Sequence, residues 1–234
     1  MEAYSDYSVH PALMSWTEQP IYFVDFEGSR TSGILEYGVA EVLGGKIVSA
    51  QTRLCRATGD VRAEDVAVHG LREESLAAQA PFADEWEYFA GLRERGPLAA
   101  HYAGVENGLL KSVWPYPRSS PDFARPGERV VEWGPWIDSA RLYAQLYPSF
   151  PSGKLEALVA GCGFQAELDA LAAAHCPPDR RHFHAALYDA LAGALLLAVL
   201  ARDPVLAKLS TMQLLALSTL DGEKRDALQQ RELF

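Results

Sequence analysis

Apolar and polar positions alternate most clearly near the start of the chain, in the run Ile21 to Glu27. Alternate residues of a strand point to opposite faces, and here both faces are apolar except for Asp25 and Glu27. A strand that is apolar on both faces is typical of the centre of a sheet. The pattern therefore predicts a central strand that carries two carboxylates on the same face.

Two further strand-like runs follow at residues 34–43 and 47–54, and the Gly44-Gly45 pair between them is typical of a hairpin. Short strands are expected at residues 97–101 and 136–138. The expected helices span residues 63–68, 81–95, 106–114, 139–146, 154–160, 166–174, 184–201 and 204–217. A meander, then alternating strands and helices, then helices alone predicts an α/β domain with a mixed sheet.

Composition narrows the class of protein. A hydrophobic fraction of 49% and a charged fraction of 22% are typical of an ordinary globular domain. The apolar run 185–201 is flanked by charged residues and favours a buried helix over a membrane span. Three cysteines without metal-ligand spacing, and no signal peptide, predict a cytoplasmic protein with reduced thiols.

A net charge of −10 argues against a broad duplex-binding surface, which is normally basic. The negative net charge is still compatible with a protein that binds only a few nucleotides at a strand end, because bound metal ions supply positive charge themselves.

Three segments carry the candidate chemistry. Asp25 and Glu27 are costly on an interior face unless they bind metal or form a salt bridge, and both readings stay open from this pair alone. His184 lies at the start of an expected helix, and Asp189, five residues later, would point back to the sheet. Glu106 falls where another helix is expected to begin, and a favourable interaction with the helix dipole would explain it equally well.

Together these segments resemble the motifs of the DnaQ-like exonucleases of the DEDDh class, the family of polymerase proofreading subunits. The matches, all in the family's order, are VDFEGSRTSGILEYGVAEV from Val24, VHGL from Val68, HYAGVENGLL from His101, the region from Ile137 to Leu158, and HAALYDA from His184. The resemblance spans about residues 20 to 200. It implies a ribonuclease H-like fold with a mixed five-stranded sheet, an antiparallel meander plus parallel strands, flanked by helices.

The resemblance also implies roles for individual residues. Two divalent cations, Mg²⁺ or Mn²⁺, would be bound by Asp25, Glu27, Glu106 and Asp189. The general base would be His184. Substrate contacts would come from Gly28, Ser29, His101 and Arg181. The chain departs from the family at Glu106, where aspartate is usual, at Tyr102, where asparagine is usual, and at Gly28, where a small hydroxyl residue is usual.

The expected domains are an N-terminal extension (1–19), an exonuclease domain (20–203) and a C-terminal helix and tail (204–234).

The expected activity is removal of nucleoside 5′-monophosphates from a 3′ end, with DNA favoured over RNA. The alternatives are an RNA-trimming enzyme of the same class and a catalytically weak module that binds nucleic-acid ends. A phosphatase-like metalloenzyme is disfavoured, since the expected His/Asp ligand clusters are missing from the sequence. Gln230–Phe234 resembles the bacterial clamp-binding peptide, except at Arg231, where leucine is usual, so a sliding clamp is one candidate partner. The favoured alternative is that Leu233 and Phe234 pack against the domain as an ordinary chain end.

Overall fold

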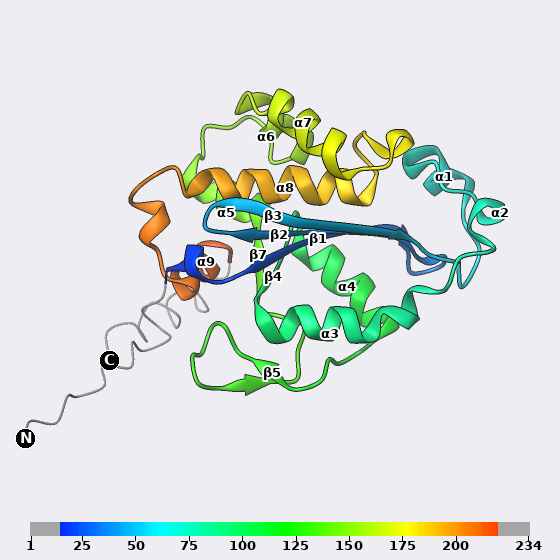
Figure 1. Cartoon of the computed structure of the whole chain (residues 1–234), viewed down its shortest axis with the longest axis horizontal. Helices are drawn as coiled ribbons and strands as arrows, with labels where there is room; N and C mark the ends of the chain where they lie inside the picture. Colours follow the sequence, from blue (N-terminus) through cyan, green and yellow to red (C-terminus); the bar gives the residue numbers. More distant parts are fainter. Residues whose placement is uncertain (1–14, 220–234) are drawn as a thin grey trace, which may run out of the picture.

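A five-stranded mixed sheet forms the centre of the structure (Figure 1), a computed structural model that describes residues 15–219. The strand order is β3-β2-β1-β4-β7. The first three strands form an antiparallel meander, whereas β4 runs parallel to β1 and β7 parallel to β4. The strand bounds are β1 Ile21–Ser29, β2 Gly33–Leu43, β3 Lys46–Leu54, β4 Leu98–Ala100 and β7 Trp136–Asp138. The expected mixed sheet is confirmed.

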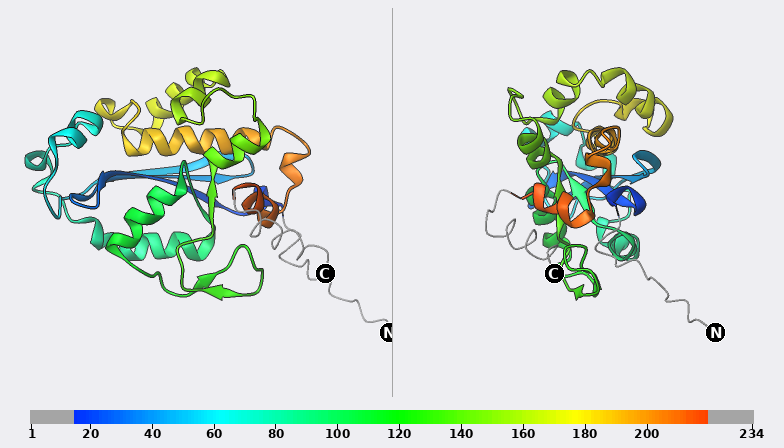
Figure 2. Two further views of the ribbon diagram at one scale, coloured as in Figure 1. Left: turned by 180° about the vertical axis from the view of Figure 1, so that it is seen from behind. Right: turned by 90° about the vertical axis from the view of Figure 1, so that its left-hand side faces the viewer.

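Helices cover both faces of the sheet, as Figure 1 and the two views of Figure 2 show. The α-helices are α1 Ala63–His69, α2 Glu73–Leu76, α3 Trp86–Arg95, α4 Ala103–Val113, α5 Ser139–Leu146, α6 Leu155–Gly161, α7 Gln165–His175, α8 Ala186–Leu200 and α9 Thr211–Leu217. Short 3₁₀ turns are η2 Trp16–Glu18, η3 Phe82–Glu85, η4 Pro178–Arg180 and η5 Leu206–Lys208. A separate ribbon pairs β5 Ser120–Pro121 with β6 Arg129–Val130.

Two hydrophobic cores lie on opposite faces of β1. One contains Phe23 and the buried side chains of α8, and α6 and α7 lie outside that helix (Figure 1). The other contains Val24 and Phe26, and it is covered by α3 and α4. This two-sided burial confirms that β1 is a central strand, and it directs the face of Asp25 and Glu27 toward α8.

Helix α8 approaches the meander closely because β2 carries a glycine at the contact. Gly38 pairs with Asp25 across the strands, and a Cβ atom at Gly38 would lie 2.3 Å from the carbonyl oxygen of Ala186. That distance is shorter than real Cβ contacts allow. Gly38 therefore lets the first turn of α8 rest against the sheet beside Asp25.

Several expected helices differ from the structure in their bounds, among them helix 81–95, which is a 3₁₀ turn followed by α3. The predicted helix 204–217 is instead a 3₁₀ turn followed by α9, because Ser210 and Gln213 form a capping box that starts a new helix. The predicted helix 106–114 begins earlier, at Ala103, so Glu106 lies in its first turn rather than at its first residue.

The two predicted terminal regions contact each other within the described residues. Trp16 is buried, and its ring nitrogen donates a hydrogen bond of 2.8 Å to the carbonyl oxygen of Leu206. The proposed boundaries at residues 20 and 204 stay a prediction. Among the helices of residues 15–219, no single one is long and apolar enough to span a membrane, although the bent pair α6 and α7 passes by length and composition alone.

Candidate active site

Asp25 lies in the middle of β1, opposite Gly38 and therefore beside the start of α8, and Glu27 follows two residues later. Glu27 is 9% exposed. The Asp25 residue is partly exposed, whereas its carboxylate group is surrounded by protein atoms. The alternation of the strand thus places both carboxylates on one face, as expected from the sequence.

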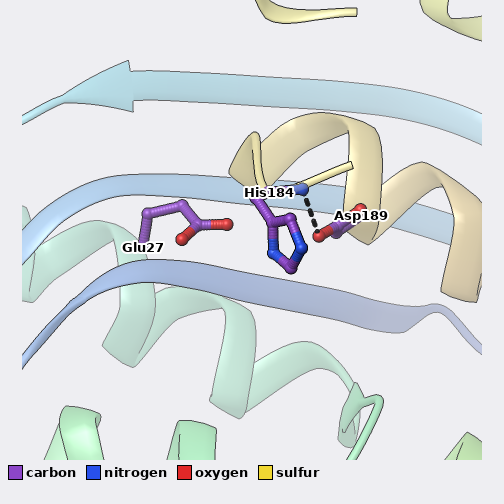
Figure 3. Close-up of side chains that lie close together, drawn as sticks. All are labelled: Glu27, His184 and Asp189. Carbon is purple, nitrogen blue, oxygen red and sulfur yellow. Dashed lines mark hydrogen bonds between the residues drawn. The ribbon is translucent and has the colours of Figure 1, made fainter. Parts of the chain in front are cut away.

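The start of α8 brings two more site residues to this face. The backbone N–H of His184 donates a hydrogen bond of 3.0 Å to Asp189 Oδ2 (Figure 3). Glu27, His184 and Asp189 each offer a ligand atom, and these atoms all lie within 4.8 Å of one another. Asp189 is buried, whereas the His184 side chain is exposed. The structure therefore joins the strand that carries Glu27 and the segment that carries His184 and Asp189 at one point.

His184 has a left-handed backbone, with φ of 64°, and α8 begins two residues later at Ala186. Only a few per cent of non-glycine residues adopt a positive φ, although histidine does so more often than most. The predicted helix start at residue 184 is therefore two residues early. Because the chain turns at this residue, the His184 N–H points to Asp189 rather than into a helical hydrogen bond.

Glu106 reaches the site from the opposite layer. It lies in the first turn of α4 and is 5% exposed, and the nearby backbone of Phe26 on β1 lowers the pKa of its carboxyl group against the effect of burial. Tyr102, just before the helix, is the other non-glycine residue with a positive φ (60°) among those described. Strained backbone of this kind gathers at functional sites.

Burial raises the pKa values of all four carboxyl groups, and the charges of neighbouring carboxylates add to the effect. Burial, followed by the charges of Glu106, Asp189 and Glu27, raises the pKa of Asp25 well above its ordinary value. Burial also raises the pKa of Glu27 and of Glu106 to about 8. For Asp189 burial raises the pKa to about 7 against the opposing hydrogen bond from His184. Such a cluster favours a bound cation, which would stabilise the ionised carboxylates.

Two carboxylate oxygen atoms without hydrogen-bond partners support a metal site here. Among the described residues, Asp189 Oδ1 and Glu106 Oε2 are buried and have no hydrogen-bond partner. Buried polar atoms are nearly always paired, so an unpaired carboxylate oxygen calls for a ligand. Carboxylate oxygens are the ligands that Mg²⁺ and Mn²⁺ prefer. The residues present therefore fit hard divalent cations.

Gly28 and Ser29 end β1 and begin the turn to β2. Gly28 has φ of 130°, and a Cβ atom there would lie 2.2 Å from the carbonyl oxygen of Gly33. This close turn explains why no hydroxyl residue stands after Glu27. The Ser29 hydroxyl lies 3.1 Å from the hydroxyl of Ser32. Substrate contacts by Gly28 and Ser29 stay a prediction.

His101 and Arg181 have defined partners of their own. The ring nitrogens of His101 lie 2.9 Å from Ser139 Oγ and 2.8 Å from the carbonyl oxygen of Gly153. The Arg181 guanidinium donates to the carbonyl oxygens of Cys176 and Ala173 at the end of α7. These bonds hold the loop before α6 and the end of α7, and substrate contacts by either residue stay a prediction.

Neither Glu36 nor a structural role for Arg180 was predicted from the sequence. Glu36 lies directly opposite Glu27 in the pairing of β1 with β2, is 2% exposed, and forms an ion pair with Arg180. One signal was available in the sequence: Glu36 is a charged residue inside the apolar run ILEYGV. Its partner could not be identified, because 144 residues separate the two.

Comparison with known proteins relates the fold of this chain to that of solved exonucleases. No protein-family model and no curated protein sequence matches the chain. A structure of exonuclease X in complex with 5′-overhanging duplex DNA is 21% identical, with a TM-score of 0.63, and the match covers 85% of this chain and 99% of that one.

Two further structures match most of this chain. The zinc-bound Escherichia coli exonuclease I complex with single-stranded DNA has 15% identity and a TM-score of 0.58; the match covers 81% of this chain but only 42% of that one. The nuclease domain of 3′hExo bound to rAMP, a DEDDh family member, has 14% identity and a TM-score of 0.57, with 81% and 95% covered. The chain therefore shares its fold with solved exonucleases, among them a DEDDh family member.

Proposed function

We propose that the protein is a DEDDh-type, divalent-metal-dependent 3′→5′ exonuclease that releases nucleoside 5′-monophosphates. The observation that carries the proposal is the convergence of four buried carboxylates from three distant segments, beside one exposed histidine. An acid cluster of this kind is costly to the fold without a cation, so a functional role explains why it is present. The shared fold with solved exonucleases supports the same proposal.

Each side chain has a proposed task. Asp25, Glu27, Glu106 and Asp189 hold two divalent cations, Mg²⁺ or Mn²⁺. When bound, such ions supply positive charge to the attacking and leaving oxygens of a phosphodiester displacement. His184 takes the proton from the attacking water at an imidazole nitrogen, and its exposure gives that nitrogen access to solvent.

DNA is the first proposed substrate and RNA the second. The similar exonuclease X and exonuclease I structures contain DNA, which favours DNA. The similar 3′hExo domain contains rAMP, and another similar 3′-exonuclease is described with a histone mRNA stem-loop, which keeps RNA trimming as the alternative. The site chemistry would be the same for both substrates.

End-labelled DNA and RNA oligonucleotides, incubated with Mg²⁺ or Mn²⁺ and separated on gels, test the proposal. We expect a ladder of products from a 5′-labelled strand, since nucleotides are removed from the 3′ end. A 3′-labelled strand should release labelled mononucleotide at once. Absence of both products with either metal and either nucleic acid would contradict the proposal and favour an end-binding module.

The sliding-clamp contact stays a separate prediction, because Gln230–Phe234 lies outside the described residues. Deleting these five residues should abolish clamp binding without changing the melting temperature. A large fall in melting temperature, in a protein that never bound the clamp, would contradict the contact. The cytoplasmic location likewise stays a prediction from the sequence.

A further inference from the structure

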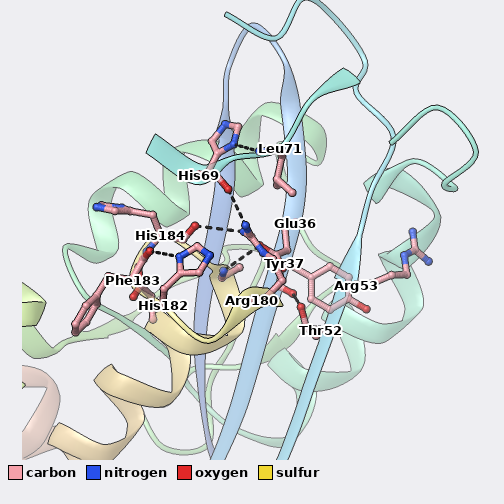
Figure 4. A network of polar contacts seen from close by, with 12 residues as sticks. Glu36, Tyr37, Thr52, Arg53, His69, Leu71, Arg180, His182, Phe183 and His184 are labelled. Carbon is pink, nitrogen blue, oxygen red and sulfur yellow. Dashed lines mark hydrogen bonds and ion pairs between the residues drawn. The ribbon is translucent and has the colours of Figure 1, made fainter. Parts of the chain in front are cut away.

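Glu36 is a buried acceptor at the junction between β2 and α8. Its carboxylate accepts hydrogen bonds from Arg180 Nη2 and, at 3.3 Å, from Arg180 Nε (Figure 4). The same carboxylate accepts the backbone N–H of Ala186 at 3.1 Å. Glu36 therefore fixes both the guanidinium of Arg180 and the first residue of α8.

Arg180 extends this network to two backbone carbonyls. Its Nη1 donates to the carbonyl oxygen of His69 at 2.6 Å, and its Nη2 donates to the carbonyl oxygen of His184 at 3.2 Å. Arg180 is only 9% exposed. One rigid guanidinium thus joins β2, the end of α1 and the segment that carries His184.

His184 needs such support because its backbone is strained. A left-handed conformation at a residue with a side chain persists only when the surroundings enforce it. Here its carbonyl oxygen is held by Arg180, its N–H by Asp189 and the N–H of Ala186 by Glu36. The His184 backbone is therefore held from both sides, and the Asp189 carboxylate is oriented through the His184 N–H.

We propose that the Glu36–Arg180 ion pair is a positioning pair for the metal site: it holds the His184 backbone in the left-handed conformation that places the imidazole beside Glu27 and aims the N–H at Asp189. The inference rests on the proposed function and adds two residues that touch neither metal nor substrate. They act through the orientation of His184 and Asp189.

A purely stabilising role is the competing explanation. A buried ion pair is weak evidence for stability, since apolar pairs of similar size often replace one without loss. The double variant Glu36→Met/Arg180→Met makes use of this property. Removing both charges avoids the lone buried charge that either single variant would leave. It also deletes the hydrogen bond from Arg180 to the His184 carbonyl oxygen and the one from the Ala186 N–H to Glu36, while the bond between the His184 N–H and Asp189 remains.

Arg93 offers a matched control. It is fully buried, and it donates to the carbonyl oxygens of Trp133, Pro121 and Gly134 on the α3 side of the sheet. Arg93→Met therefore deletes a buried arginine with three carbonyl acceptors, but none of those acceptors belongs to the site. It is expected to lower the melting temperature while leaving kcat and the Kd for Mn²⁺ unchanged.

The test compares the full-length wild type, the double variant and the control in three measurements: the melting temperature, kcat and KM on an end-labelled oligonucleotide, and the Kd for Mn²⁺ alone by electron paramagnetic resonance. For the double variant we expect kcat to fall, and the Kd for Mn²⁺ to rise, about 10–100-fold, as for residues that orient metal ligands. KM should change by less than about threefold, because the pair does not touch the substrate.

Two outcomes would overturn the inference. One is a folded double variant whose kcat and Kd for Mn²⁺ stay within about twofold of wild type. The other is a control variant that loses kcat and Mn²⁺ binding as strongly as the double variant, since that would show a general response to lost stability. If the wild type degrades no nucleic acid, the proposed function fails, but the Mn²⁺ measurement still decides whether the pair positions the site.

Discussion

Glu27 and Glu36 face each other directly across β1 and β2, and both side chains are buried. Like charges opposite each other destabilise a pair of strands. Arg180 forms an ion pair with Glu36, and its charge also lowers the pKa of Glu27, although burial and Asp189 outweigh that effect. The protein thus neutralises Glu36 internally, and Glu27 is the glutamate that we propose binds a cation.

Mn²⁺ should stabilise the protein. A ligand at about 100 times its Kd adds about 2.7 kcal/mol to the unfolding free energy, which is about 5–10 °C in melting temperature for a chain of this size. Differential scanning fluorimetry with and without Mn²⁺ measures the shift. The shift should vanish in Asp25→Asn and persist in Glu87→Gln, a change at an exposed ion pair. An unshifted wild type would argue against the metal site.

Without metal, Glu27→Gln should be more stable than wild type, and the difference should grow with pH. Burial raises the pKa of Glu27 from 4.5 to about 8, so the folded protein keeps a proton that the unfolded chain releases. The wild type therefore loses stability as pH rises from about 4.5 to about 8, by up to about 1.4 kcal/mol per pH unit. Melting curves in EDTA across this range measure it; a constant difference would contradict the shift.

His184→Gly and His184→Ala should differ in stability but not in activity. Both remove the imidazole, so both should lower kcat about 10²–10⁴-fold. The alanine variant should be about 1–2 kcal/mol less stable than the glycine variant, because alanine must adopt a left-handed backbone that glycine adopts freely. Turnover assays and melting curves separate the two effects. His182→Ala is the control, and a severe loss there with a mild one at His184 would mean that the motif assignment is wrong.

Glu106→Gln should lower activity strongly, by about 10–100-fold if the carboxylate binds or orients a metal ligand. Glu106→Asp should keep activity with a changed preference between Mn²⁺ and Mg²⁺, because the shorter side chain moves the carboxylate. Parallel kcat measurements in the two metals check both statements. A Glu106→Gln enzyme as active as wild type would leave only a favourable charge at the start of α4.

Gly38→Ala should disturb the site from a distance. The new Cβ atom would lie 2.3 Å from the Ala186 carbonyl oxygen, so the start of α8 must move away from Asp25. We expect a loss of about 1–3 kcal/mol from this overpacking, together with weaker Mn²⁺ binding. Gly104→Ala is the control, because nothing lies within 4 Å of its added Cβ atom. Equal melting temperatures and Mn²⁺ affinities for Gly38→Ala and wild type would contradict the packing argument.

Local patterns predicted the parts of the fold that depend on neighbouring residues. The alternation from Ile21 to Glu27 was enough to place two carboxylates on one face of a central strand, because side-chain direction in a strand depends only on position. The Gly44-Gly45 pair likewise predicted the β2–β3 hairpin. Both conclusions are confirmed by the structure.

Tertiary contacts explain why the start of α8 and the role of Arg180 were not predicted correctly from the sequence. The start of α8 was placed two residues early, because the left-handed backbone of His184 is held by partners elsewhere in the chain. Of the adjacent arginines, Arg181 was selected as functional, yet Arg180 is the one whose guanidinium turns inward to Glu36. The capping box at Ser210, by contrast, was visible in the sequence and would have corrected the predicted helix 204–217.

The reach of Arg180 along the chain has a consequence for folding. Its two distant partners, Glu36 and the carbonyl of His69, precede it by 144 and 111 residues. Contacts between residues so far apart form late, after the entropy of closing long loops has been offset by other contacts. A chain still emerging from the ribosome, or one truncated before residue 180, therefore contains Asp25, Glu27 and Glu106 but lacks the guanidinium and the start of α8. Such an incomplete chain should bind metal weakly, so tight metal binding would indicate that the chain has finished folding.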